Sequence, residues 1–282
     1  MARWLVRFGY DGSGFSGWAR QPGLRTVEGE IRAGLALRGV APSPDEASLE
    51  VASRTDRGVS ARGNALVLRT SLTGEALVRR LNTIAPELCF TAATRVLPEF
   101  RVRGASQRTY RYFDPGPVND PERAFRAALL FQGRVDVRSF GRGLSQRTPQ
   151  WRTVQSVVLR PVDGGREIEV RAPSFVWGMV RKIVGALREV DQGRLSLGQL
   201  RAAVDGNDRL TLPLAEPEGL VLWDVEYSGL AWEIQWAGPN RHQVASGLRS
   251  RATTWQRTSV LGTLRELELA GSRPVASRHA NR

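Results

Sequence analysis

The chain has 282 residues, of which 41% are hydrophobic, so it can bury a sizeable core in one or two domains. Its formal net charge of +13 indicates a polyanionic partner, and nucleic acid is the commonest one. The single cysteine, Cys89, excludes an intrachain disulfide framework, and the two histidines, His242 and His279, lie too late in the chain for Ser-His-Asp catalysis or a His-based zinc site in the main body. We find no transmembrane segment, signal peptide or basic amphipathic helix with an aromatic face, and therefore expect a cytoplasmic protein without membrane contact.

Arginine almost wholly replaces lysine, and Lys182 is the only lysine. A bias in genomic composition explains that ratio, but it does not explain the excess of bases over acids. The charge therefore favours nucleic-acid binding over a neutral compositional effect.

The first part of the chain alternates between strand and helix patterns. Trp4, Val6 and Phe8 share one face of an expected strand, and Val27, Ile31 and Leu35 form the apolar stripe of a helix that Thr26 can cap. In chain order we expect a strand at 2–10, a helix at 27–38, strands at 49–53 and 64–70, a helix capped by Thr73 with Leu77, Leu81 and Ile84 on one face, and a strand at 88–96.

The glycines at 12, 14 and 17 match G-x-G-x-x-G after a strand, which is the dinucleotide-binding pattern. That pattern should open directly into a helix, but Trp18, Pro22 and Gly23 continue an irregular stretch. We therefore predict a loop beside a site and no dinucleotide cofactor, and keep the dinucleotide enzyme as a remote alternative.

The second part repeats this order of elements. We expect a strand at 108–113, a helix opened by Asp120 and Pro121, strands at 153–160 and 166–171 joined by Asp163 and Gly164, a helix at 174–190, a short helix with a capping box from Ser196 to Gln199, and a strand at 220–227. Two β-α-β-β-α-β units in tandem predict an α+β fold of two ferredoxin-like halves, 1–104 and 105–228. A basic extension, 229–282, follows; we expect it to be partly disordered and to hold a helix at 260–269.

One loop carries the strongest candidate for chemistry. Asp56 lies in the stretch VASRTDRGVSARGN, between two apolar strand patterns. The neighbouring Arg54, Arg57 and Arg62 favour the ionised carboxylate and can hold it by bidentate hydrogen bonds. Such a carboxylate is a candidate nucleophile. The alternative is a turn aspartate among solvated arginines.

Two later stretches complete the pattern. Residues 108–112, RTYRY, interleave basic and aromatic side chains on a strand, and residues 175–185, FVWGMVRKIVG, form an apolar segment interrupted by Arg181 and Lys182. A buried arginine needs an anionic partner, and Asp56 is the candidate. The alternative is that Arg181 extends from the surface of the helix into solvent.

Together these stretches resemble the TruA family of tRNA pseudouridine synthases. SRTDRGVSARGN resembles the family's G-R-T-D-A-G-V-H-A loop, RTYRYF its R-x-Y-x-Y strand, and FVWGMVRKIVGALREV its F-x-x-x-M-V-R-x-I-V-G-x-L helix. Weaker matches include YDGSGFSGWARQ, SQRTPQWRTV and EPEGLVLWDVEY. The matches occur in the family's order and cover roughly residues 1 to 227.

The resemblance implies two ferredoxin-like halves with a joined sheet and a basic central cleft. It also implies a homodimer that takes one tRNA across both subunits and converts uridine to pseudouridine at positions 38, 39 or 40 of the anticodon arm, without metal or cofactor. By the same resemblance Asp56 is the catalytic aspartate, Arg54 helps to place the substrate, Tyr110 stacks on the flipped target base and Arg181 pairs with the aspartate. The carboxylate can attack C1′ or C6, or assist abstraction of the C2′ proton, and the residues do not distinguish these routes.

This chain departs from the family pattern at five positions. Arg57 replaces a small residue, Ser60 a histidine and Asn64 a glutamine, while Trp177 and Gly178 stand where two histidines are common. These differences concern site preference and contacts with RNA. The main rival remains a non-catalytic RNA-binding protein that uses its two halves as RRM-type platforms.

Overall fold

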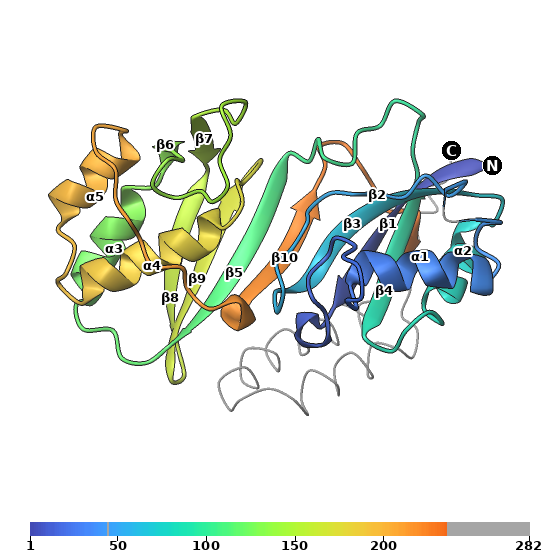
Figure 1. Cartoon of the computed structure of the whole chain (residues 1–282), viewed down its shortest axis with the longest axis horizontal. Coiled ribbons are helices and arrows are strands. Elements are labelled where there is room, and N and C mark those ends of the chain that lie inside the picture. Colours follow the sequence, from blue (N-terminus) through green and yellow to red (C-terminus); the bar gives the residue numbers. More distant parts are fainter. Residues whose placement is uncertain (44, 236–282) are drawn as a thin grey trace, which may run out of the picture.

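The fold is built on one long, mostly antiparallel sheet (Figure 1). The structure, a computed structural model, describes residues 1–43 and 45–235. In this part of the chain the strand order is β11-β4-β1-β3-β10-β5-β9-β8, with β2 beside β3, and β6 and β7 form a separate pair. The strands are β1 (Ala2–Tyr10), β2 (Glu50–Val51), β3 (Ser60–Thr70), β4 (Leu88–Arg95), β5 (Gln107–Pro115), β6 (Gly133–Asp136), β7 (Trp151–Val154), β8 (Ser156–Val162), β9 (Gly165–Ala172), β10 (Leu220–Glu226) and β11 (Ile234–Gln235).

Five α-helices accompany the sheet in the described ranges: α1 (Val27–Leu37), α2 (Gly74–Leu81), α3 (Pro121–Leu129), α4 (Met179–Asp191) and α5 (Leu197–Val204). Figure 1 shows α1 and α4 in front of the sheet, on the same face. The apolar stripe predicted for α1 is buried, since Val27, Ile31 and Leu35 are all inaccessible to solvent. None of the described helices is both long and apolar enough to cross a membrane.

Both halves of the chain have the same strand order. β4-β1-β3-β2 in the first half and β10-β5-β9-β8 in the second each place the fourth strand of their unit beside the first, followed by the third and the second. This is the order of a ferredoxin-like unit, so the predicted fold class is confirmed.

The halves join through β3 and β10, the parallel pair in an otherwise antiparallel sheet. Val221 and Leu222 pair with Ser60 and Ala61, at the start of β3. β2 pairs with Val67 and Leu66, farther along the same strand. Because β2 is only two residues long, this edge of β3 has room for β10, and the loop from β2 to β3 lies at the junction of the halves.

The face of the sheet opposite Tyr110 and Tyr112 carries a network of charges. Successive side chains of a strand point to opposite faces, so Arg111, between these core tyrosines, points away from the core. Its guanidinium lies 3.7 Å from the centre of the Trp223 ring and donates to Glu169 at 2.9 Å. Arg160 and Arg171 also pair with Glu169, whose side chain has no exposed surface. These ion pairs largely neutralise this face.

Most of the predicted elements are present, and the differences have local causes. The predicted strand 153–160 is divided into β7, which pairs with β6, and β8, which joins the main sheet. α2 ends at Leu81, so Ile84 lies beyond it, and Thr73 stands at the N-cap position without a side-chain cap hydrogen bond. β6 and β11 were not predicted from the sequence. The predicted helix at 260–269 lies outside the described residues.

Glu169 gives a test of the charge network. Burial would raise the pKa of this carboxyl, but hydrogen bonds and charges from Arg160 and Arg111 outweigh burial, and its pKa lies below the ordinary value. We expect Glu169→Gln to lower the free energy of unfolding by about 1–3 kcal/mol at pH 7, because three arginines lose their shared anion. Urea unfolding would measure the change, with exposed Glu99→Gln as the matched control.

The sign of the pH dependence follows from the lowered pKa. The stabilisation is fully present above the unfolded-state pKa and is lost as the pH falls through the folded-state value. The difference between wild type and Glu169→Gln should therefore shrink below about pH 4. A difference that stays constant down to acid pH would contradict this assignment.

Candidate active site

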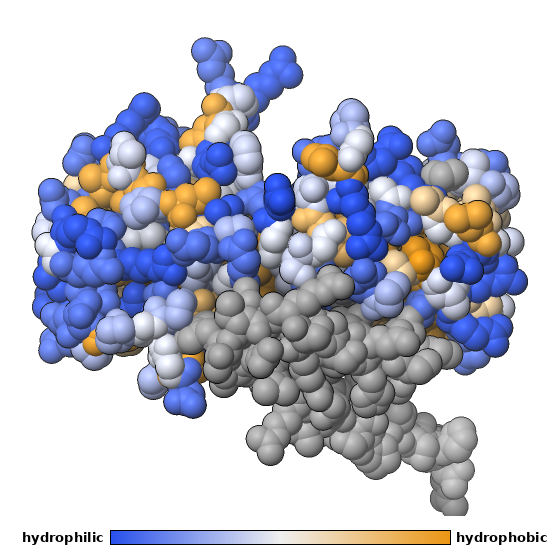
Figure 2. All heavy atoms as spheres, turned by 60° about the horizontal axis from the view of Figure 1, so that its bottom comes forward, coloured by the Kyte–Doolittle hydropathy of each residue, from blue (hydrophilic) through white to orange (hydrophobic). Residues whose placement is uncertain are grey.

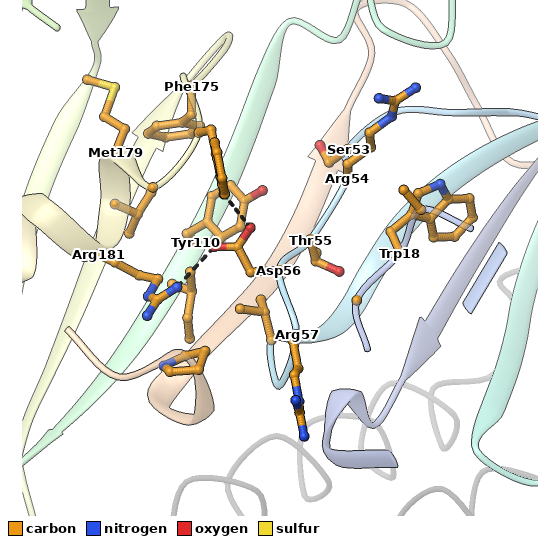
Figure 3. A pocket seen from close by; sticks show the side chains of 18 of the residues that line it. Trp18, Ser53, Arg54, Thr55, Asp56, Arg57, Tyr110, Phe175, Met179 and Arg181 are labelled. Carbon is orange, nitrogen blue, oxygen red and sulfur yellow. Dashed lines mark hydrogen bonds and ion pairs between the residues drawn. The ribbon is translucent and has the colours of Figure 1, made fainter. Parts of the chain in front are cut away.

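A cleft of about 1370 Å³ lies at the junction of the two halves (Figure 3). The loop from β2 to β3, the strand β5, and the segment leading into α4 all line it. Its acidic lining residues are Asp56 and Glu218. Its arginines are Arg54, Arg57, Arg103, Arg108, Arg142, Arg152 and Arg181. The excess of positive charge favours an anionic ligand in this cleft.

The Asp56 carboxylate is held through both of its oxygens. Arg181 donates from Nη1 to Oδ2 at 3.0 Å, and Trp177 donates from its indole Nε1 to Oδ1 at 2.7 Å. The ion pair between Asp56 and Arg181 was predicted from the sequence and is present. Figure 3 shows both contacts converging on this one side chain.

The Asp56 loop is fixed to the first half by hydrogen bonds to the residues that precede the carboxylate. The hydroxyls of Tyr10 and Thr55 lie 2.7 Å apart, and Asn64 donates to the carbonyl of Ser53 at 2.9 Å. The backbone N–H of Trp18 donates to the Thr55 carbonyl at 3.0 Å. The loop is therefore positioned by β1, by the segment that follows β1, and by β3, which carries Asn64.

Arg108 connects the same loop to the second half. Its buried guanidinium donates to the Ser53 hydroxyl at 2.9 Å, to the Ala52 carbonyl at 3.1 Å and to the Arg103 carbonyl at 2.9 Å, and also to the carbonyl of Pro173. Burial lowers the pKa of Arg108 below its ordinary value. One side chain thus joins three backbone carbonyls and one hydroxyl around the cleft.

Tyr110 follows on β5 and presents an aromatic ring beside Asp56 (Figure 3). Its ring meets Phe175 edge to face, with centroids 5.2 Å apart. Burial raises the pKa of Tyr110 to about 12, so its hydroxyl is neutral at physiological pH. A largely buried, uncharged ring at this point can contact a base by stacking.

Arg181 comes from the first turn of α4 and is only 9% exposed, so the alternative of a solvent-extended arginine is wrong. Its Nε also donates to the carbonyl of Ala215 at 2.6 Å. The predicted start of this helix near Ser174 is also wrong, because Gly178 has a positive φ of 75° and α4 begins after it, at Met179.

The three arginines near Asp56 in sequence are not its partners in space. Arg54 and Arg57 line the cleft, but Figure 3 shows their guanidinium groups pointing away from the carboxylate. Arg62 does not line the cleft, and its guanidinium lies 4.7 Å from the centre of the Trp223 ring. A register shift between Phe8 and Tyr10 places Ala61 opposite Tyr10, which turns Arg62 to the other face of the sheet.

Trp177 is a site residue that was not predicted from the sequence. It was noted only as a departure from the family's pattern, within a segment expected to be helical. The pattern gives the position of a residue relative to Arg181, but the direction of its side chain depends on Gly178, whose positive φ interrupts the helix. Arg142, whose guanidinium lies 4.5 Å from the centre of the Trp177 ring, was also missed.

The glycine-rich stretch after β1 does not form a dinucleotide site of the expected kind. Gly12–Gly14 form one short 3-10 turn capped by Asp11, and the next helix begins only at Val27. Within 1–43 and 45–235 no group of three histidine, cysteine or acidic side chains is arranged to hold a metal ion.

Comparisons with known proteins agree with the resemblance found in the sequence. A family model described as tRNA pseudouridine synthase matches residues 127–228. The tRNA pseudouridine synthase A of Thermococcus kodakarensis is 39% identical over 230 residues, which are 81% of this chain and 86% of the relative. The protein of the same name from Pyrococcus furiosus is 32% identical, over 86% of this chain and 90% of the relative. That from Methanothermobacter thermautotrophicus is 33% identical, over 80% and 82%.

Gly17 provides a test of how the Asp56 loop is held. Its φ is +94°, and a Cβ there would lie 3.0 Å from the Thr55 carbonyl oxygen and 3.1 Å from the Arg57 nitrogen. We expect Gly17→Ala to lower the free energy of unfolding by about 2–4 kcal/mol, because backbone strain and overpacking act together. We also expect the substitution to speed amide exchange across 53–59. Hydrogen–deuterium exchange and thermal unfolding would measure both effects.

Gly23→Ala is the matched control, because Gly23 also has a positive φ, +71°, but a Cβ there would meet nothing within 4 Å. Gly23→Ala therefore introduces the backbone strain of a positive φ but no close contact. Equal exchange at 53–59 in the two variants would show that Gly17 does not support the loop.

Proposed function

The chain belongs to the tRNA pseudouridine synthase family, a family of isomerases, and from this membership and the site geometry we propose that it converts uridine to pseudouridine in the anticodon arm of tRNA, at positions 38, 39 or 40. The observation that carries the proposal is the Asp56 carboxylate, paired with Arg181 inside a cleft lined by arginines. The rival of a non-catalytic RNA-binding protein explains the charge, but it gives no role to this pair.

Asp56 is the catalytic nucleophile in this proposal. The reaction breaks the bond between C1′ and N1 of uridine, turns the uracil, and joins C1′ to C5, so that the C5 proton is finally lost and N1 gains one. An ionised carboxylate can attack C1′ or C6, or remove the C2′ proton, and all three routes need a lone pair aimed at the nucleotide. Arg181 supplies a charged hydrogen-bond donor that keeps the Asp56 carboxylate oriented.

The target uridine lies within or beside a stem, so it must leave the stack before Asp56 can reach it. Flipping costs roughly a few kcal/mol. Stacking on Tyr110 would return about 1–3 kcal/mol of that cost. Arg54 and Arg57 line the cleft. In this proposal they contact phosphates, which would fix the position of the arm without reading its sequence.

We expect the enzyme to act in the cytoplasm as a homodimer that takes one tRNA across both subunits. This expectation comes from the resemblance to the TruA family. Figure 2 is consistent with a polar surface. In that view hydrophilic residues cover most of both ends of the molecule, and the hydrophobic patches among them are small and separate.

The first test is a pseudouridine assay on unmodified tRNA transcripts, with products mapped by position. Wild type should form pseudouridine in the anticodon arm, and Asp56→Ala should reduce the rate by at least about 10³-fold while tRNA binding and thermal stability remain close to wild type. Asp163→Ala, in the exposed turn between β8 and β9, is the matched control for loss of an aspartate. Undiminished turnover in Asp56→Ala would remove Asp56 from the mechanism, and product elsewhere in the tRNA would refute the site assignment.

The second test concerns the binding of tRNA phosphates by the arginines of the cleft. The affinity for tRNA should fall steeply with salt, and Arg57→Gln should reduce the slope of log K against log salt by about 1 without changing the position of the product. Sedimentation of enzyme–tRNA mixtures across a salt series would give the affinity and also the number of chains per tRNA. A flat salt response would contradict binding by the basic cleft, and one chain per tRNA would contradict the dimer.

A further inference from the structure

The second oxygen of the Asp56 carboxylate is occupied by a neutral donor. Trp177 donates its indole N–H to Oδ1 at 2.7 Å, while Arg181 binds Oδ2. Trp177 lines the cleft and is 54% exposed, in contrast to Trp18, the other tryptophan of the cleft, which is 2% exposed. A large, half-exposed aromatic residue would be free to rotate unless its surroundings held it.

The loop 141–143 packs against the Trp177 ring and holds it in place. The backbone N–H of Arg142 donates to the Trp177 carbonyl at 2.8 Å, and the Arg142 guanidinium lies 4.5 Å from the ring centre. Gly143 packs so closely that a Cβ would lie 3.1 Å from two carbon atoms of the ring. The indole is therefore fixed by its own backbone, by a cation and by a glycine with room for nothing larger.

The two donors to Asp56 also share one support. Trp177 and Arg181 are four residues apart, on either side of Gly178, at the start of α4. Gly178 has a φ of 75°, and this left-handed conformation directs Trp177 out of the helix while Arg181 remains within it. The start of one rigid helix thus supplies hydrogen-bond donors to both oxygens of a carboxylate that belongs to the other half of the protein.

We propose that Trp177 is a positioning residue for Asp56. Its N–H fixes the rotation of the carboxylate plane, so that the lone pairs left free by Arg181 and Trp177 are directed at the bound nucleotide. Because the indole is uncharged and does not titrate at physiological pH, it orients the anion without adding a second positive charge beside it. This inference depends on the proposed role of Asp56 as nucleophile.

The test is a single-turnover assay with enzyme in excess over tRNA, which separates the chemical rate from the dissociation constant. Trp177→Phe keeps an aromatic ring and loses the donor, so the rate at saturating enzyme should fall about tenfold to a hundredfold while the tRNA dissociation constant changes less than about twofold. Trp151→Phe, a tryptophan on β7 outside the cleft lining, is the matched control and should react at the wild-type rate.

Trp177→His supplies the readout that a merely structural role would not change. Its imidazole restores an N–H donor, so part of the lost rate should return at pH 8. The imidazole gains a proton and becomes a cation as the pH falls through about 6.5, so the rate relative to wild type should change through that range. Trp177→Phe should show a constant ratio to wild type over the same pH range.

Gly143→Ala tests the packing of loop 141–143 against the ring without altering Trp177. The added Cβ must displace the ring, so the rate should fall in the same direction as in Trp177→Phe. Gly229→Ala has a similar positive φ, 72°, with open space around it, and controls for backbone strain.

Three results would overturn the proposal. An unchanged rate in Trp177→Phe would show that the hydrogen bond is dispensable, and a raised rate would show that the ring obstructs the nucleotide. A weaker tRNA affinity at an unchanged saturated rate would make Trp177 a stacking surface. Asp56→Ala distinguishes the two proposals: if that variant is inactive and Trp177→Phe is fully active, only the role of Trp177 fails, whereas an active Asp56→Ala removes both.

Discussion

The candidate site depends on the parallel pairing of β3 with β10. This pairing covers only two residue pairs, Val221 with Ser60 and Leu222 with Ala61, yet it makes one sheet from two ferredoxin-like halves. The Asp56 loop enters from the first half directly before β3, while Tyr110, Trp177 and Arg181 belong to the second half. Neither half alone brings the carboxylate and its partners together, so the geometry of the site is set by how the halves join.

Such a short pairing needs support from side chains, and Arg108 provides much of it. Its guanidinium bridges Ala52 and Ser53 of the first half, Arg103 between the halves, and Pro173 ahead of α4. A buried arginine with carbonyl and hydroxyl acceptors fixes their relative positions through several directional hydrogen bonds. The Asp56–Arg181 pair crosses the same junction but is partly exposed, so it contributes orientation more than stability.

Much of this arrangement can be predicted from the sequence, because its main signals are local or chemically compelling. Periodicity located the longer strands and helices, and a cation within an apolar segment required an anion, which led from Arg181 to Asp56. The predictions that were wrong concern features that only the three-dimensional structure determines. Arg62 turns away because of a bulge that depends on the pairing of β1 with β3, and α4 starts late because of one positive φ at Gly178. The two donors to Asp56 therefore differ in how they could be found. Arg181 is implied by its charge, whereas Trp177 is neutral and leaves no such signal.

The charges of the two faces of the sheet explain how a protein with many arginines directs them at one ligand. On the face away from the cleft, Arg111, Arg160 and Arg171 share Glu169, and Arg7 pairs with Asp224. In the cleft, seven arginines face two acids, and one of these acids, Asp56, is already bound by Arg181. The described part of the cleft thus holds an excess of positive charge that a polyanion can neutralise, and that polyanion would also bring its target to Asp56. A neutral donor such as Trp177 suits this environment, because a further cation would compete with the substrate phosphates for the same carboxylate.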